Sequence, residues 1–118
     1  MQFRARSVVG FEVTPEVLEA LGEEAKEAFE SWKKNYDTDS FAGFLAESFK
    51  LPEFTDVYIA SFEYWRGGEI QGLEGFEWGK TYCYFRADDT KRKGWKPFAT
   101  KLKKKDIVLE SAQFSELG

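Results

Sequence analysis

The sequence predicts an α+β fold: one domain, residues 1–118, with an N-terminal strand, a helical hairpin, and then three or four mostly antiparallel strands. Three observations support this prediction. Apolar residues recur with helical spacing only between about residues 15 and 50. Aromatic and β-branched runs precede and follow that region. No repeat or domain boundary interrupts the chain, so we expect one sheet with the helices packed on one face.

The first element is a strand over residues 2–13, because its residues alternate with a period of two. One face carries Phe3, Ala5, Ser7, Val9, Phe11 and Val13, and the other carries Arg4, Arg6, Val8 and Glu12. This pattern is typical of a strand that is buried on one face only. We therefore expect the first set to face the core.

A helix is predicted near residues 15–35. Thr14 is a suitable N-cap, and Pro15 occupies the favoured first position. We expect Gly22 to weaken the helix by about 1 kcal/mol relative to alanine without ending it. The apolar stripe of this helix comprises Leu18, Leu21, Ala25, Ala28, Phe29, Trp32 and Tyr36.

A second helix is predicted near residues 40–50, where Phe41, Phe44, Leu45 and Phe49 repeat at helical spacing. The segment DTDS, residues 37–40, supplies capping side chains, and Pro52 follows the helix. Because the connection is short, we expect a hairpin of helices with Phe29, Trp32, Phe44 and Phe49 inside the core.

The composition of the remaining chain is typical of β-strands. Residues 55–65, 80–87 and 106–114 are aromatic and β-branched. Between the first two lies a glycine-rich segment, residues 66–79, which we expect to form a hairpin. Residues 97–103 fit either a strand or a short helix.

The composition excludes several classes of chemistry. The chain has no histidine and one cysteine, Cys83, so it contains neither a Ser-His nor a Cys-His pair. One chain also lacks the ligands of a structural zinc site. We expect no enzyme activity, no metal and no cofactor. The lone cysteine, an N-terminus without a signal-like apolar core, and the lack of a membrane-length apolar run favour a cytoplasmic location.

Two resemblances to ligand-binding loops fail on spacing. The segment GFEWGKT, residues 75–81, has three residues where a phosphate-binding loop needs four, and a strand-like run follows it. The segment beginning at Asp37 has Ser48 at the position where a calcium loop needs glutamate. We therefore interpret the first as part of a strand hairpin and the second as helix capping.

An acidic stripe runs along the first predicted helix, opposite its apolar face. It comprises Glu16, Glu19, Glu23, Glu27 and Glu30. Like-charge pairs four residues apart cost about 0.2–0.5 kcal/mol each, and only the first turn is explained by the helix dipole. One interpretation is a solvated face. The other is a patch for a basic protein partner, carried by Glu19, Glu23, Glu27 and Glu30.

The glycine-rich segment has two main interpretations. Its five glycines either form turns and a bulge, or they make a mobile hairpin that presents Ile70, Leu73, Phe76 and Trp78 to a protein. A weaker alternative is a small-ligand or carbohydrate site that uses the nearby carboxylates of Glu63, Glu69, Glu74 and Glu77.

Residues 91–105 contain eight basic side chains and no acidic one, although the chain as a whole has a net charge of −4. One interpretation is a lysine-rich strand edge that opposes aggregation. The alternative is a nucleic-acid site that pairs phosphates with lysine and stacks bases on tryptophan. Its residues would be Lys91, Arg92, Lys93, Trp95, Lys96, Lys101, Lys103, Lys104 and Lys105.

The lead hypothesis from the sequence is a small non-catalytic domain, of accessory or inhibitor type, that binds a protein. Nucleic-acid binding through residues 91–105 is the alternative, because the acidic net charge opposes it without excluding it. A small-ligand site at residues 66–79 is the third hypothesis. We expect no membrane association.

Overall fold

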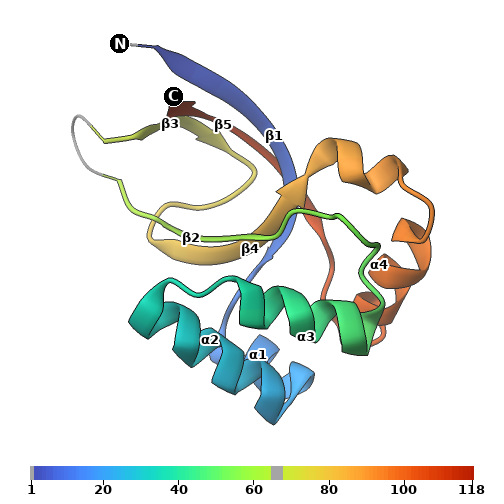
Figure 1. The fold of residues 1–118 in the computed structure, drawn as a ribbon. Coiled ribbons are helices and arrows are strands. Elements are labelled where there is room, and N and C mark those ends of the chain that lie inside the picture. Colours follow the sequence, from blue (N-terminus) through green and yellow to red (C-terminus); the bar gives the residue numbers. More distant parts are fainter. Residues whose placement is uncertain (1, 65–67) are drawn as a thin grey trace.

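Five strands form one antiparallel sheet in the computed structural model, which describes residues 2–64 and 68–118 (Figure 1). They are β1 (Phe3–Glu12), β2 (Tyr58–Phe62), β3 (Ile70–Glu74), β4 (Lys80–Arg86) and β5 (Glu110–Leu117). Their order across the sheet is β2-β4-β1-β5-β3. The predicted α+β class is confirmed, and four strands follow the helical hairpin.

Strand β1 is the centre of the sheet. It pairs with β4 from Val8↔Arg86 to Glu12↔Tyr82, and with β5 along most of its length. Gly10 lies where β1 and β4 approach closely, because a Cβ atom there would stand 2.3 Å from the carbonyl oxygen of Cys83. A larger residue at position 10 would separate the two strands.

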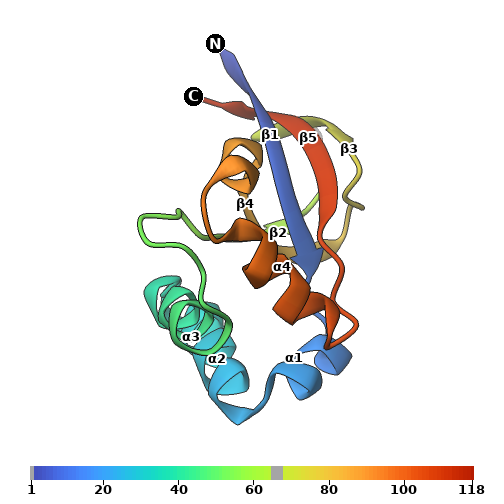
Figure 2. The ribbon, with the colours of Figure 1, turned by 90° about the vertical axis from the view of Figure 1, so that its right-hand side faces the viewer.

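The helices are α1 (Pro15–Leu21), α2 (Glu23–Asn35), α3 (Asp39–Phe49) and α4 (Trp95–Lys103), with a 3-10 helix η1 (Ala87–Lys91) before α4. Figure 2 shows α4 against the sheet, with α1, α2 and α3 gathered at one end of the molecule. Residues 97–103, which fitted either a strand or a helix, belong to α4. None of the helices in the described residues is long and apolar enough to cross a membrane.

The prediction of one continuous helix near residues 15–35 is wrong. Gly22 has φ +107° and ψ 179°, so the backbone leaves the helical region and α2 begins in a new direction. The capping predictions are confirmed at two positions. Thr14 Oγ1 accepts a hydrogen bond from Val17 N at 3.0 Å, and Asp37 Oδ1 accepts one from Ser40 N at 3.2 Å.

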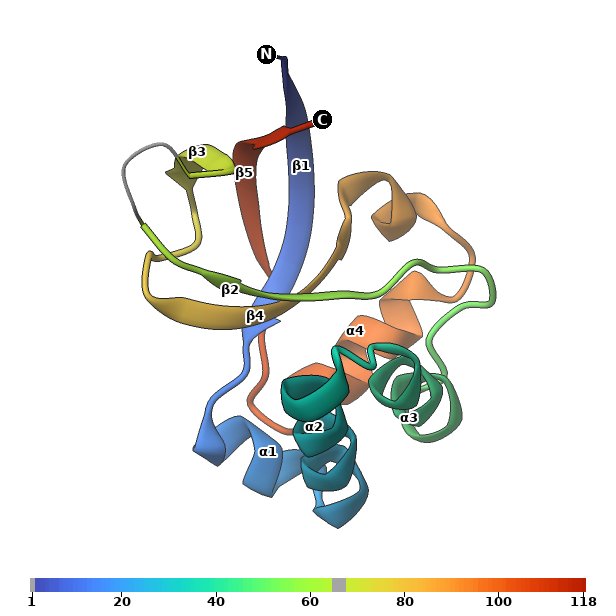
Figure 3. The same cartoon turned by 60° about the vertical axis from the view of Figure 1, so that its left-hand side comes forward.

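The sheet is strongly curled, and β2 and β4 cross β1 and β5 at a steep angle (Figure 3). Inside the curl lies a cluster of buried side chains: Val8, Phe62, Phe76, Tyr82, Tyr84, Ala112 and Phe114. The expectation that β1 is buried on one face only is therefore wrong. Val8 is 1% exposed, whereas Ala5 and Ser7, on the face that we expected to be buried, are exposed.

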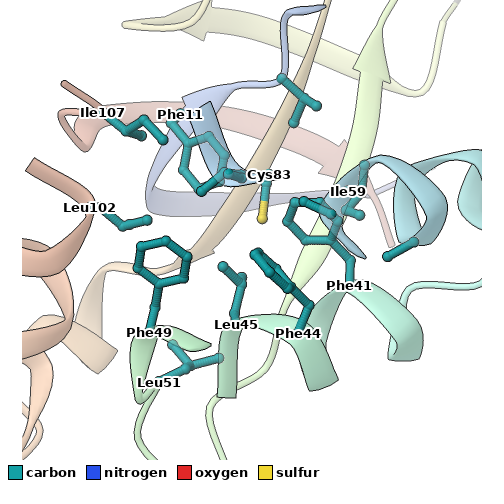
Figure 4. Close-up of a cluster of buried hydrophobic side chains, with 14 of the residues drawn as sticks. Phe11, Phe41, Phe44, Leu45, Phe49, Leu51, Ile59, Cys83, Leu102 and Ile107 are labelled. Carbon is teal, nitrogen blue, oxygen red and sulfur yellow. The ribbon is translucent and has the colours of Figure 1, made fainter. Parts of the chain in front are cut away.

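A larger cluster fills the space between the helices and the opposite face of the sheet. Figure 4 shows the Cys83 side chain pointing from β4 into this cluster, toward Phe44 and Leu45 of α3. Phe29, Phe44 and Phe49 are buried there as predicted. Trp32 is only half-buried, and Tyr36 is 83% exposed because α2 ends there in a left-handed turn.

Candidate functional site

The predicted acidic stripe is divided between two helices and is partly neutralised by two lysines. Lys26 Nζ lies 2.5 Å from a carboxylate oxygen of Glu19 and 3.1 Å from one of Glu23. Hydrogen bonds to these two glutamates raise the pKa of Lys26 above its ordinary value. Glu30 pairs with Lys33 at 3.4 Å. Of the four predicted protein-binding glutamates, Glu27 alone makes no ion pair within 4.0 Å in the described part of the chain.

Glu27 instead belongs to a groove between α2 and α3 with a volume of about 580 Å³. Its carboxylates are Glu24 and Glu27 from α2, and Asp39 and Glu47 from α3. All four side chains are exposed. Within residues 2–64 and 68–118, none of them lies within 4.0 Å of a lysine or arginine nitrogen. We name this feature the acidic groove.

The floor of the acidic groove is made mostly of small side chains: Ala28, Ser31, Ser40, Gly43 and Ala46. Small residues let the backbone or a long side chain of another molecule approach the helices closely. The dipole of each helix stabilises Glu24 and Asp39 in the first turns. It opposes Glu47, which lies near the C-terminal end of α3. Stabilisation of the helices therefore does not explain all the negative charge in the groove, since Glu47 is unfavourable for its own helix.

Sequence reasoning found Glu27 but missed Glu24, Asp39 and Glu47. The missed residues come from two helices, and only the packing of α2 on α3 brings them together. One signal was present in the sequence. Residues 39–47 place Ser40, Gly43 and Ala46 opposite the phenylalanine stripe, and Asp39 and Glu47 fall on the same face at helical spacing.

The apolar side chains of the glycine-rich segment do not form an exposed surface. Ile70, Leu73 and Trp78 are half-buried against the cluster inside the curl. Phe76 is 4% exposed, so its assignment as an interface anchor is corrected. Its ring stacks on Tyr82 with centroids 3.9 Å apart, and Glu77 N donates a hydrogen bond to the Tyr82 hydroxyl at 2.9 Å.

Residues 75–79 thus cover one side of the buried cluster inside the curled sheet. Gly75 has φ +94°, and a Cβ atom there would lie 2.2 Å from the Ser111 carbonyl oxygen, so the chain passes directly against β5. Phe76 fills part of the interior of the curl. The predicted hairpin begins at residues 66 and 67, which lie outside the described residues; its next part forms β3.

The basic segment is helical and does not form a sheet edge, so its interpretation as a protected strand edge is wrong. The edge strands are β2 and β3. Trp95 is 6% exposed and packs on Phe85 and Phe98, which leaves it unable to stack on a nucleic-acid base. Arg92 lies 3.9 Å from the buried carboxylate of Asp89 and donates to Thr55 Oγ1 at 3.4 Å.

The lysines of the basic segment are the part that stays accessible. They are Lys91, Lys93, Lys96, Lys101, Lys103, Lys104 and Lys105, and none has an ion pair within 4.0 Å among the described residues. Lys101, Lys103 and Lys104 surround the C-terminal end of α4, where positive charge offsets the helix dipole.

The remaining candidates for chemistry are the Cys83 thiol and groups of metal-binding side chains. Cys83 is fully buried, and burial raises the pKa of its thiol far above the ordinary value, which disfavours the reactive thiolate. In the part of the chain that the structure describes, no group of three Cys, Asp or Glu side chains could hold a metal ion.

Comparisons with known proteins found no matching family model, no similar curated protein and no similar solved structure.

Proposed function

We propose that this chain is a small non-catalytic domain, of accessory or inhibitor type, that binds a protein partner through the acidic groove. The observation that supports the proposal is a groove of about 580 Å³ with four exposed carboxylates that have no basic partner among the described residues. Complementary charge steers association and selects partners. The partner segment that fits this groove is therefore rich in lysine or arginine.

The test compares two variants that lose the same charge. Glu27→Gln with Glu47→Gln neutralises the acidic groove, and Glu53→Gln with Glu63→Gln neutralises two exposed carboxylates elsewhere. Each variant is used as bait in a native lysate treated with nuclease. We expect a protein captured by the wild type at low salt to be retained by the control variant and lost by the groove variant. Capture by the wild type should itself weaken at high salt, because salt screens the groove carboxylates. Equal capture by all three baits would contradict the proposal.

Nucleic-acid binding through the exposed lysines is the second candidate function. It is supported by the seven lysines of residues 91–105 that make no ion pair in the described chain. The same capture experiment without nuclease tests it, together with a mobility-shift assay. Salt-sensitive binding that is lost when Lys101, Lys103, Lys104 and Lys105 become glutamine would favour this function over the first.

A further inference from the structure

A second groove, of about 500 Å³, lies where the start of α2, the C-terminal half of α3 and the end of α4 meet. One wall carries the carboxylates of Glu23 and Glu24, and the opposite wall carries Lys101, Lys104 and Lys105. Between the walls lie Phe44, Phe49 and the small, exposed Ser48. We name this feature the two-walled groove.

The opposite charges of the two-walled groove face each other but do not pair. Within residues 2–64 and 68–118, no ion pair of 4.0 Å or less joins the two walls. Glu23 contacts Lys26 on its own helix at 3.1 Å. Among the described residues, Glu24 and the three lysines make no ion pair within 4.0 Å. The groove therefore stays open, with most of its charges free to meet another molecule.

The arrangement of the walls determines which kind of molecule fits. A nucleic acid would be repelled by the glutamate wall, and a basic peptide by the lysine wall. In a two-fold symmetric dimer, one patch meets itself after rotation by 180°, so opposite charges are needed on the two sides of the axis. An axis through the C-terminal half of α3 would set the glutamates of each copy against the lysines of the other, with Ser48 allowing close approach.

We propose that the two-walled groove is the interface of a homodimer, and that its occupant is a second copy of this chain. Because charge pairs provide specificity more than affinity, the dimer is reversible and weakens with salt. Glu24 lines both grooves, but Glu27 and Glu47 line only the acidic groove, and Lys101, Lys104 and Lys105 line only the two-walled groove. Variants at these unshared residues therefore test the two proposals separately.

Sedimentation analysis of the whole chain, over a concentration series at low and high salt, tests the proposal. One variant reverses the lysine wall (Lys101→Glu, Lys104→Glu), and the other reverses the glutamate wall (Glu23→Lys, Glu24→Lys). Each variant alone brings like charges together, so we expect its dimer dissociation constant to rise by about tenfold or more. An equimolar mixture of the two should restore association as a heterodimer.

The control variant, Lys91→Glu with Lys93→Glu, makes the same change in net charge as the lysine-wall reversal but lies outside the groove, and it should dimerise like the wild type. Far-UV circular dichroism establishes that each variant is folded, and Lys101→Gln with Lys104→Gln replaces a reversal variant that is not. A wild type that stays monomeric throughout the series would overturn the proposal. So would a dimer that neither reversal weakens, or a mixture of folded reversal variants that fails to associate.

Discussion

Phe54 has two properties that are unfavourable for the stability of the fold. Its side chain is 87% exposed, and its backbone has φ +65°, a left-handed conformation that costs an aromatic residue free energy. The turn is nevertheless held firmly. Thr55 N and Thr55 Oγ1 both donate to the carbonyl oxygen of Pro52, and Arg92 donates to Thr55. The surrounding contacts therefore maintain the strain at Phe54.

We predict that Phe54→Gly raises the free energy of unfolding by up to about 1 kcal/mol. Glycine relieves the left-handed strain, although its extra freedom in the unfolded chain reduces the gain. Chemical denaturation of the two proteins measures the difference. The matched control is Val108→Gly, which also removes an exposed apolar side chain but has no positive φ, and should not stabilise. A less stable Phe54→Gly variant would show that the Phe54 ring supports the fold.

At the scale of elements, patterns within one segment were predictable, and features formed by two segments were not. The phenylalanine stripe of residues 41–49 predicted α3 and its buried face. The period-two pattern of residues 2–13 located β1 but misjudged its faces, because Val8 lies on a face that also carries Arg6 and Glu12. That face is buried by Phe62, Phe76 and Phe114, which come from other elements.

One signal for the second buried face was present in the sequence of β4. The run Tyr82, Cys83, Tyr84 and Phe85 is apolar at every position, which indicates a strand covered on both faces. The helix break at Gly22 had no such signal, because glycine within an apolar helical stripe is often tolerated. The acidic groove and the two-walled groove depend on how helices pack, and that information is absent from any single segment.

Tyr84 on β4 gives the buried face inside the curl a pH dependence. Burial raises the pKa of its phenol from the ordinary value near 10 to about 12, and the nearby Arg6 partly offsets this rise. Between these pH values the folded protein retains the proton and the unfolded chain loses it. Stability is therefore complete below pH 10 and falls as the pH rises toward 12.

We predict that the wild type loses roughly 2 kcal/mol of stability between about pH 10 and pH 12 through Tyr84 alone. Tyr84→Phe should make the decline shallower. Some slope should remain, because the pKa values of Tyr82, Lys26 and Lys80 are also raised in the folded protein. Denaturation midpoints measured across this pH range check the prediction, and identical slopes in the two proteins would contradict it.

On the scale of the whole molecule, one sheet carries two hydrophobic clusters on opposite faces. The α-helices α1, α2, α3 and α4 pack on the first face, whereas residues 75–79 cover part of the second. The two clusters share their strands. In β4, Tyr82 and Tyr84 belong to the second cluster, and Cys83 and Phe85 belong to the first. If β4 were displaced from the sheet, both clusters would therefore lose buried side chains at the same time.

We therefore predict that the domain unfolds in a single cooperative transition, and that damage inside the curl destabilises helices that it does not touch. Phe62→Ala removes a fully buried ring that contacts four other aromatic rings, which should cost about 3–5 kcal/mol. The far-UV circular dichroism of the helices should then be lost at a lower denaturant concentration, as it should for Leu45→Ala in the first cluster. If instead the helical signal of Phe62→Ala persisted to the wild-type midpoint, while the near-UV signal of the aromatic cluster was lost earlier, the two faces would be independent units. Because Val8 and Phe11 place neighbouring parts of β1 in different clusters, we expect the two signals to change together.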